Sequence, residues 1–307
     1  MRHGKYPFLV AFLAPPVALY GVYVVSPYLQ AFYISLTRWS GFSGNVEFIG
    51  LANYRRLLED DQFHTALVNN LILLACLPVI TIIMGLFFAS MLNIGGRRGR
   101  AGIRGVAGSA VYRVIYFFPQ VLSVAIIGVL WLYLLAPGRG LVDRSLDGFW
   151  LGWLTPNEGW LGNPGTAFWW VLAAMVWMNV GFYIVLFSAG MQSIPRDVYE
   201  AALLDGASRF TTFWRITVPL LWDSVQVAWI YLAIIALDAF ALVQIMLGNA
   251  GGPSRSGDVI GLNLYRTAFE AFNFGYASAM GVTLFFLTLI IAVLAMRATR
   301  RDRVEFS

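Results

Sequence analysis

Long runs of residues without a charged side chain limit most strongly what this chain can fold into. A helix needs about 20 predominantly apolar residues to cross the hydrocarbon core of a bilayer. Five plain uncharged runs are long enough: 6–37, 65–96, 114–138, 159–195 and 271–296. A sixth, 220–247, qualifies if Asp223 lies near its end and Asp238 is tolerated inside. We therefore expect an all-α polytopic membrane protein with about six transmembrane helices.

We place these spans within one transmembrane domain, residues 1–307, at about 8–36, 66–93, 114–136, 167–191, 220–247 and 275–297. The first follows basic residues, as a secretory signal peptide does. Its apolar stretch is about twice the usual length, and no small-x-small cleavage site follows before Arg38. We therefore expect a retained helix, bent at Pro15, Pro16 or Pro27.

The basic residues predict the orientation of the chain. Cytoplasmic segments of membrane proteins carry an excess of Lys and Arg. With a cytoplasmic N-terminus, 14 of the 21 basic residues fall in the N-terminal tail, the 94–113 loop, the 192–218 loop and the C-terminal tail. We therefore expect both termini in the cytoplasm and a long outer loop at 137–166. We interpret the arginine cluster of the 94–113 loop as basic residues that determine the membrane orientation of the chain and that bind no specific partner.

Composition excludes several kinds of site. A single cysteine, Cys76, forms no intrachain disulfide, and two histidines, His3 and His64, are too few for a histidine-based metal site or catalytic triad. The only lysine is Lys5, so the chain holds no Walker A loop, and any ATP must be bound by another chain. The arginines stand in short clusters between apolar runs, a pattern of membrane loops and not of nucleic-acid binding.

The 192–218 loop has a pattern that a simple connection does not need. Pro195 suits a first helical turn, and Asp197 and Glu200 complement the dipole of a helix that begins there. Gly206 is free to adopt the positive φ that ends such a helix, and a second short helix is expected at about 208–218. Small residues beside two acids favour a docking surface for another protein. The alternative is an interfacial helix without a partner.

This loop resembles the hallmark of the permease subunits of binding-protein-dependent ABC importers, which reads Glu-Ala-Ala, three residues, Gly, and later a hydrophobic residue, Ile and Pro. The resemblance implies a type I importer permease fold and a coupling helix that sits in a cleft of the ATPase subunit. The matching positions are Glu200, Ala201, Ala202, Asp205, Gly206, Ala207, Phe213, Ile216 and Pro219.

Two further segments are similar to the carbohydrate-type group of that family. One is Phe48–Tyr54 with Phe63, Ala66, Leu67 and Asn69, and the other is Gly251–Pro253 with Tyr265, Ala268, Phe269 and Phe274–Ala279. The sequence departs from the group at Asn70, where threonine is frequent, and at Leu247–Ala250, where Leu-Thr-x-Gly is usual. The departures leave the class intact and put the outer gate in doubt.

Polar and aromatic residues within the spans are candidates for a substrate pathway. Asp238, in the expected middle of the fifth span, either lines the pathway or is a structural partner of another helix. The aromatic residues either hold sugar faces or pack helices at the interface. The candidates are Asp238, Gln244, Asn179, Trp177, Tyr183, Tyr231 and Phe240. The tryptophans of the outer loop, at 150, 153 and 160, form either a lid, a binding-protein contact or an aromatic belt.

The resemblance implies a transport subunit in the bacterial inner membrane, with no catalytic residue, metal or cofactor of its own. Its implied partners are a second permease, an ATPase dimer that binds ATP and Mg, an extracytoplasmic solute-binding protein and membrane lipids. The implied substrate is a sugar, oligosaccharide or amino sugar, with a glycerol phosphodiester as the alternative. A secondary transporter would predict internal repeats or several intramembrane acids, and an intramembrane hydrolase would need a nucleophile with a base.

Overall fold

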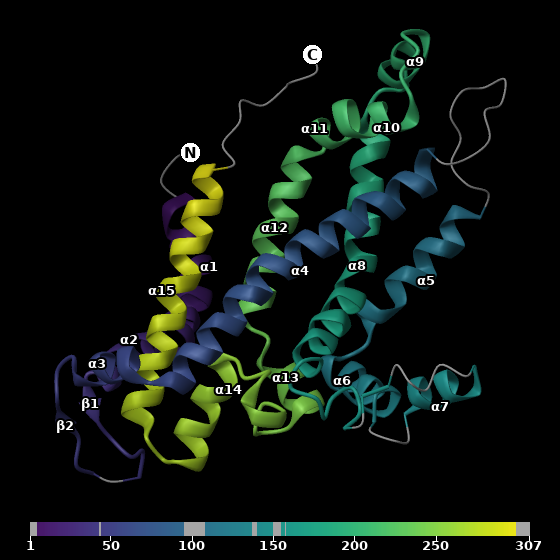
Figure 1. The fold of residues 1–307 in the computed structure, drawn as a ribbon. Helices are drawn as coiled ribbons and strands as arrows, with labels where there is room; N and C mark the ends of the chain where they lie inside the picture. Colours follow the sequence, from purple (N-terminus) through teal and green to yellow (C-terminus); the bar gives the residue numbers. More distant parts are fainter. Residues whose placement is uncertain are drawn as a thin grey trace. The chain divides into compact units, whose positions relative to one another are not determined.

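A computed structural model describes residues 5–42, 44–94, 108–136, 140–149, 155–156 and 158–298 (Figure 1). These residues are almost entirely helical, apart from a two-stranded antiparallel ribbon of β1 (Thr37–Arg38) and β2 (Glu47–Phe48). The helices are α1 (Lys5–Tyr20), α2 (Ser26–Ser35), α3 (Ala52–Glu59), α4 (Asp61–Ile94), α5 (Ser109–Val121), α6 (Val124–Leu134), α7 (Leu141–Gly148), α8 (Ala167–Ser193), α9 (Arg196–Leu204), α10 (Arg209–Thr212), α11 (Val218–Leu220), α12 (Trp222–Leu237), α13 (Phe240–Leu247), α14 (Ile260–Tyr265) and α15 (Phe274–Ala298).

Four helical segments in the described part of the chain are long and apolar enough to cross a membrane: Leu9–Ser35, Asp61–Asn93, Ala167–Ser193 and Phe274–Leu294. Two sharply bent helix pairs raise the number to six if each pair is one span. Helices α4, α8 and α15 coincide with the runs expected at 66–93, 167–191 and 275–297. The helical polytopic fold class is thus confirmed.

The run expected as one helix at 114–136 is instead two helices that meet at 98°. Pro119 lies in the last turn of α5, and Leu122 and Ser123 adopt extended backbone. The Ser123 hydroxyl then accepts a hydrogen bond from the Ile126 N–H at 3.4 Å, which starts α6. A proline followed by an N-cap serine ends one helix and begins another, so the expectation of a continuous helix was wrong.

The run expected as one helix at 220–247 is also divided. Helix α12 ends at Leu237, residues Asp238 and Ala239 form a break, and α13 follows. The sequence predicted that Asp238 lies in the middle of a continuous helix. In the structure it lies at the C-terminal end of α12 instead. At its other end α12 joins the preceding Phe210–Leu220 segment with a bend of 71°.

The first apolar segment is irregular between its prolines. Residues Gly21–Val25 form a π-helical turn, in which the Ser26 N–H bonds to the Gly21 carbonyl. Pro15 and Pro16 lie inside α1, and Pro27 begins α2. Since proline lacks an N–H, Pro27 removes one helical hydrogen bond in this region, which accounts for the widened turn.

Internal contacts divide the chain into two units, which are described separately. Unit 1 is Met1–His64 with Asn263–Leu287, and unit 2 is Thr65–Leu262 with Thr288–Ser307. Unit 1 contains part of each segment that resembles the carbohydrate-type group: Phe48–Tyr54 with Phe63 from one, and Tyr265, Ala268, Phe269 and Phe274–Ala279 from the other. The Asn53 amide donates to the Ser35 carbonyl at 2.8 Å and to the Thr37 carbonyl at 2.9 Å, and so holds the end of α2.

The start of α15 is fixed against the same ribbon. The Gly275 N–H donates to the Trp39 carbonyl at 3.1 Å, and a Cβ at position 275 would overlap the Thr37 carbonyl. The Tyr276 hydroxyl donates to Asp60 at 2.6 Å, while the Arg56 guanidinium lies 4.3 Å from the centre of the Tyr276 ring. These segments are therefore structural, and they join residues far apart in the sequence.

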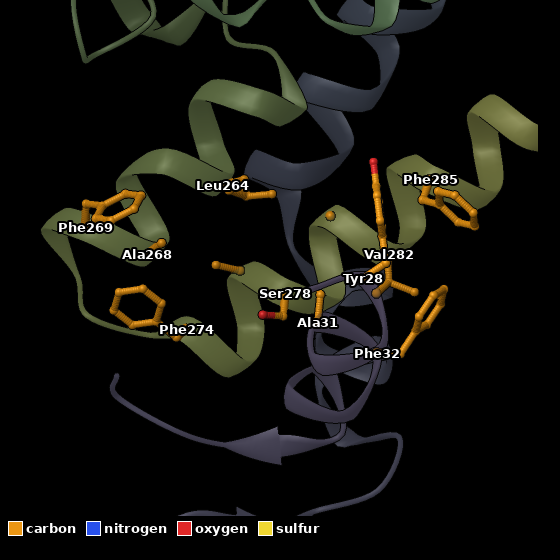
Figure 2. A pocket seen from close by; sticks show the side chains of 12 residues that line it. Tyr28, Ala31, Phe32, Leu264, Ala268, Phe269, Phe274, Ser278, Val282 and Phe285 are labelled. Carbon is orange, nitrogen blue, oxygen red and sulfur yellow. The ribbon is translucent and has the colours of Figure 1, made fainter. Parts of the chain in front are cut away.

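Unit 1 contains a cavity of about 320 Å³ between α2, the π-helical turn Arg266–Glu270 and α15 (Figure 2). Aromatic rings and small or aliphatic side chains line it, and the Phe269 and Phe274 rings meet edge to face with their centres 5.7 Å apart (Figure 2). Apart from Tyr28 and Ser278, its lining residues have no polar side-chain group. A sugar needs several hydrogen-bonding groups, so this cavity does not suit one.

Unit 2 is packed around α8. Its core includes the fully buried Leu73 and Leu77 of α4, Ile127 of α6, and Met175 and Phe187 of α8. Helix α5 runs beside α8 (Figure 1), and a Cβ at Gly181 would overlap the Tyr116 backbone, so these helices approach closely.

The expected outer loop is partly helical. Helix α7 lies within it, and the Trp160 ring contacts the Trp170 ring of α8 at 5.4 Å. Trp150 and Trp153 lie outside the described residues, as do 95–107 of the arginine-rich loop and both chain ends.

Candidate coupling loop and transport pathway

The first half of the 192–218 loop is a short helix with a glycine stop. Pro195 is the residue before α9, and Asp197 lies in the first turn. At the other end the Ala207 N–H reaches the Ala202 carbonyl at 2.9 Å, and Gly206 has a φ of +73°. This six-to-one hydrogen bond over a left-handed residue is a Schellman ending. The expected helix and glycine turn are both present.

The second half is helical but not uniform. Ser208 starts it by accepting from the Thr211 N–H at 3.1 Å, and α10 is followed by a π-helical turn at Phe213–Thr217 and then by α11. Pro219 in α11 has no N–H for the Arg215 carbonyl, which explains why the helix widens there. The helix expected at 208–218 is thus Arg209–Leu220 in three parts.

The two halves are joined by Tyr199 and Thr217, whose hydroxyls lie 3.4 Å apart. Burial raises the pKa of Tyr199, and the hydrogen bond to Thr217 partly offsets that rise. Ala202 is buried, while Val198 and Phe213 pack against the core of unit 2. These contacts join the two halves of the loop to each other and to the core of unit 2.

The resembling residues thus divide into two groups. Glu200, Ala201, Asp205, Gly206 and Pro219 are exposed, and Ala202, Ala207, Phe213 and Ile216 are buried or half-buried. Three large apolar side chains that the sequence reasoning did not select are also exposed: Leu204 at 89%, Phe210 at 73% and Trp214 at about half. These residues lie in the two helical segments expected on either side of the glycine turn, and that position was the sequence signal that could have identified them. We call Leu204, Phe210 and Trp214 the apolar patch of the loop.

A polar cluster lies where three helices end near this loop. The Arg113 guanidinium of α5 donates to the Asn93 side-chain oxygen of α4 at 2.8 Å, and Asn93 donates to the Ser188 hydroxyl of α8 at 3.0 Å. With its oxygen turned toward Arg113, the Gln192 amide accepts at 3.0 Å. The last turn of α8, which leads into the loop, is therefore held to α4 and α5.

The pathway candidates do not form one cluster. Asn179 is buried and donates to the Met175 carbonyl of its own helix at 2.8 Å. Tyr183 is also buried, and Tyr231 of α12 is exposed. Trp177 is half-exposed and ends a row of indole rings through Trp131, at 6.0 Å, so packing accounts for part of its role.

The remaining candidates lie around the break after α12. The Asp238 side chain is exposed at the break, and Phe240 begins α13 with its Cβ against Gly261. Gln244 donates to the Asn249 side chain at 3.0 Å. Asn249 belongs to one of the departures from the carbohydrate-type pattern, so that departure takes part in the structure of the loop after α13.

No group of three or more His, Cys, Asp or Glu side chains able to hold a metal is found among the described residues. The candidate residues offer hydrogen-bonding side chains, the exposed Asp238 carboxylate and aromatic faces near a helix break, and the 192–218 loop offers an exposed surface to another protein.

Comparison with known proteins identifies the class of this arrangement. Residues 65–303 match the family model described as "Binding-protein-dependent transport system inner membrane component". The chain is 41% identical to the diacetylchitobiose uptake system permease protein NgcF of Streptomyces coelicolor, over 98% of this chain and 84% of that protein. It is 31% identical to the multiple sugar-binding transport system permease protein MsmF of Streptococcus mutans, over 95% of each chain.

The fold has a solved counterpart. A chain in the crystal structure of a bacterial ABC transporter involved in the import of alginate aligns with a TM-score of 0.80 and 22% identity, over 97% of this chain and 96% of that one. These matches confirm the resemblance drawn from the loop motif. The chain belongs to the inner-membrane permease components of binding-protein-dependent ABC importers, and it is a transport subunit and not an enzyme.

Proposed function

We propose that this chain is one of two permeases in an ATP-driven importer of an amino-sugar oligosaccharide, and that it forms half of the translocation pathway. The observation that carries the substrate class is the 41% identity, over nearly the whole chain, to a diacetylchitobiose uptake permease. A solute-binding protein would deliver the sugar to the outer face, and an ATPase dimer that binds ATP and Mg would drive alternating access from the cytoplasm.

The distribution of basic residues supports a cytoplasmic position for both termini and for the 192–218 loop. An ATPase subunit that holds ATP is cytoplasmic, so charge and motif agree on the side. The same orientation puts the 137–166 loop on the outer face, where the binding protein docks.

The 192–218 loop has the properties of a docking element. The apolar patch exposes large side chains, which are costly in water and typical of contacts with a partner. Glu200 and Asp205 are exposed beside it and would pair with basic residues at the rim of an ATPase cleft. Tyr199 and Ala202 attach the opposite side of α9 to the rest of the protein, so movement of the ATPase would be passed to α8.

The break after α12 supports a pathway at that position. Irregular backbone at membrane depth is tolerated where it is buried in protein or lines a water-filled cavity, and the exposed Asp238 carboxylate requires water. Phe240 and Gln244 of α13, with the exposed Tyr231 of α12, would offer an aromatic face and hydrogen bonds to a sugar near this break. A carboxylate there repels an anion, which favours a neutral sugar over a glycerol phosphodiester.

The test is uptake by proteoliposomes that contain this chain, its partner permease and the ATPase, with the sugar-loaded binding protein outside and ATP inside. We expect uptake of labelled diacetylchitobiose that requires hydrolysable ATP. Glycerol phosphodiester supplied with its own binding protein serves as the matched comparison. Uptake of the phosphodiester without uptake of the sugar would refute the proposed substrate, and sugar uptake without any ATPase would refute the importer mechanism.

A further inference from the structure

Asn70 of α4 is fully buried, and within the described residues its side chain bonds to backbone groups that are far away in the sequence. Its amide nitrogen donates to the carbonyls of Ala236 and Leu237, at 3.3 and 3.4 Å. Its oxygen accepts from the Ile260 N–H at 2.8 Å. One amide therefore connects α4, the last turn of α12 and the first residue of α14.

The backbone groups that Asn70 contacts are those that helix ends leave unsatisfied. The last carbonyls of α12 have no partner in their own helix because α12 ends at Leu237, and the N–H of Ile260 has none because α14 begins there. An unpaired polar group in an apolar interior is costly. Asn70 removes this cost on both sides of the break.

The sequence on α4 reinforces this arrangement. The neighbouring Asn69 donates to the Ser256 carbonyl at 3.0 Å and to the Asp258 carbonyl at 2.8 Å. Two successive asparagines thus hold the segment that leads into α14, and the second also holds the end of α12. A threonine at position 70 has a single hydroxyl, so it cannot donate to the carbonyls through one group and accept from Ile260 through another.

This arrangement fixes the position of Asp238. It follows directly after the two carbonyls that Asn70 contacts, its φ and ψ of −97° and 38° are not helical, and its side chain is exposed. No hydrogen bond or ion pair of its carboxylate is found within the described residues. We propose that Asn70 is a positioning residue of the transport pathway, which keeps α12 broken so that the Asp238 side chain stands in water. This proposal rests on the proposed function.

Loss of the Asn70 amide has a definite structural consequence. Without it, the carbonyls of Ala236 and Leu237 regain partners only if the helix continues across residues 238 and 239. That rearrangement withdraws the side chain of residue 238 from the aqueous pathway. The accessibility of position 238 is therefore the direct readout, and general loss of stability does not reproduce a change confined to that position.

The experiment uses the assembled transporter in nanodiscs, with Cys76→Ser as the background because Cys76 is the only native cysteine. Asp238→Cys is labelled with a charged, membrane-impermeant thiol reagent, and Glu59→Cys, an exposed site on α3, is the reference. Thr81→Val is the matched control, since Thr81 is also fully buried on α4 and its hydroxyl has no hydrogen-bond partner among the described residues.

We expect Asn70→Val to slow labelling at position 238 by about tenfold, the factor that corresponds to roughly one net buried hydrogen bond. Asn70→Thr is expected to give a smaller decrease, and Thr81→Val none, while labelling of Glu59→Cys is unchanged throughout. Unchanged labelling at position 238 in Asn70→Val overturns the proposal. An equal decrease at both positions, or failure of both Asn70 variants to assemble, also overturns it, because Asn70 is then a general folding residue. Labelling does not depend on the solute, so failed diacetylchitobiose uptake refutes the proposed substrate alone.

Discussion

Gly206 offers the sharpest test of how the 192–218 loop works. A glycine can be required because a side chain would clash with its surroundings or because the backbone adopts a positive φ, and the surroundings of Gly206 distinguish these two reasons. Its φ is +73°, and a Cβ built there meets no atom within 4 Å. Within this chain, alanine at this position is therefore penalised by backbone conformation and not by a clash. That penalty is about 1–2 kcal/mol for an ordinary residue in the left-handed region, and asparagine tolerates the region better.

The strain acts on a loop whose halves share one long hydroxyl contact, between Tyr199 and Thr217. A penalty of about 1–2 kcal/mol lowers the population of the native loop by at most about 5- to 30-fold, and the apparent Kd for the ATPase rises by the same factor. We expect Gly206→Ala to weaken ATPase association about fivefold, and Gly206→Asn to weaken it less than about twofold. Gly206→Pro should abolish it, because it forbids the φ and removes the N–H that bonds to the Leu203 carbonyl at 3.1 Å.

The assay is binding of the purified ATPase subunit to nanodisc-embedded permease pair, read as a Kd for each variant. If Gly206→Asn binds more weakly than Gly206→Ala, the ATPase needs a small residue there and the conformational reasoning is wrong. If all three variants bind like the parent, the loop is not the docking element.

Three further predictions follow from other contacts. Leu204→Ser should weaken ATPase association about tenfold without changing the Tm, since the side chain is exposed and at a predicted interface. Leu58→Ser, at another exposed leucine on α3, should change neither ATPase association nor the Tm, and equal effects of the two variants would show that the patch is not specific. Gly181→Ala should prevent assembly, because its Cβ would overlap the Tyr116 backbone. Gly21→Ala, which has open space around its Cβ, should assemble normally, and size-exclusion chromatography measures assembly of both variants. Burial tends to raise the pKa of Asp60, but hydrogen bonds from Tyr276 and from the backbone N–H groups of Phe63 and Gln62, with the charge of Arg56, lower it overall. Its stabilising contribution is therefore present above the ordinary aspartate pKa and lost as the pH falls below it. Tyr276→Phe should lower the Tm at pH 7 and reduce its loss on acidification below about pH 4, as followed by thermal unfolding; an unchanged pH dependence would contradict this.

The sequence predicted those parts of the structure that depend on local patterns. Uncharged runs located the long helices, and Asp197 and Gly206 correctly placed the start and end of α9. The family could be identified because the loop motif is contiguous in the sequence.

The helix breaks were missed for different reasons. The α5–α6 bend had a local signal, Pro119 followed by the N-cap Ser123, which the apolar run obscured. The break after α12 has no such signal. It depends on Asn70, which is 166 residues before Ala236, and such long-range pairing of a buried amide cannot be read from hydropathy. Asn70 was noticed only as a departure from a family pattern, and the structure gives that departure a role.

The central claim is that an ATPase drives this permease through the 192–218 loop, and cross-linking tests it most directly. In the Cys76→Ser background, a short bifunctional cross-linker is attached to Glu200→Cys on α9, or to Glu47→Cys on β2, which is also exposed, as a control. The transporter is assembled in nanodiscs with ATP and a hydrolysis-deficient ATPase. We predict that the ATPase is captured from position 200 and not from position 47. Capture from position 47 would contradict the account. So would capture from neither position, when the same cysteine variants import the sugar with the active ATPase.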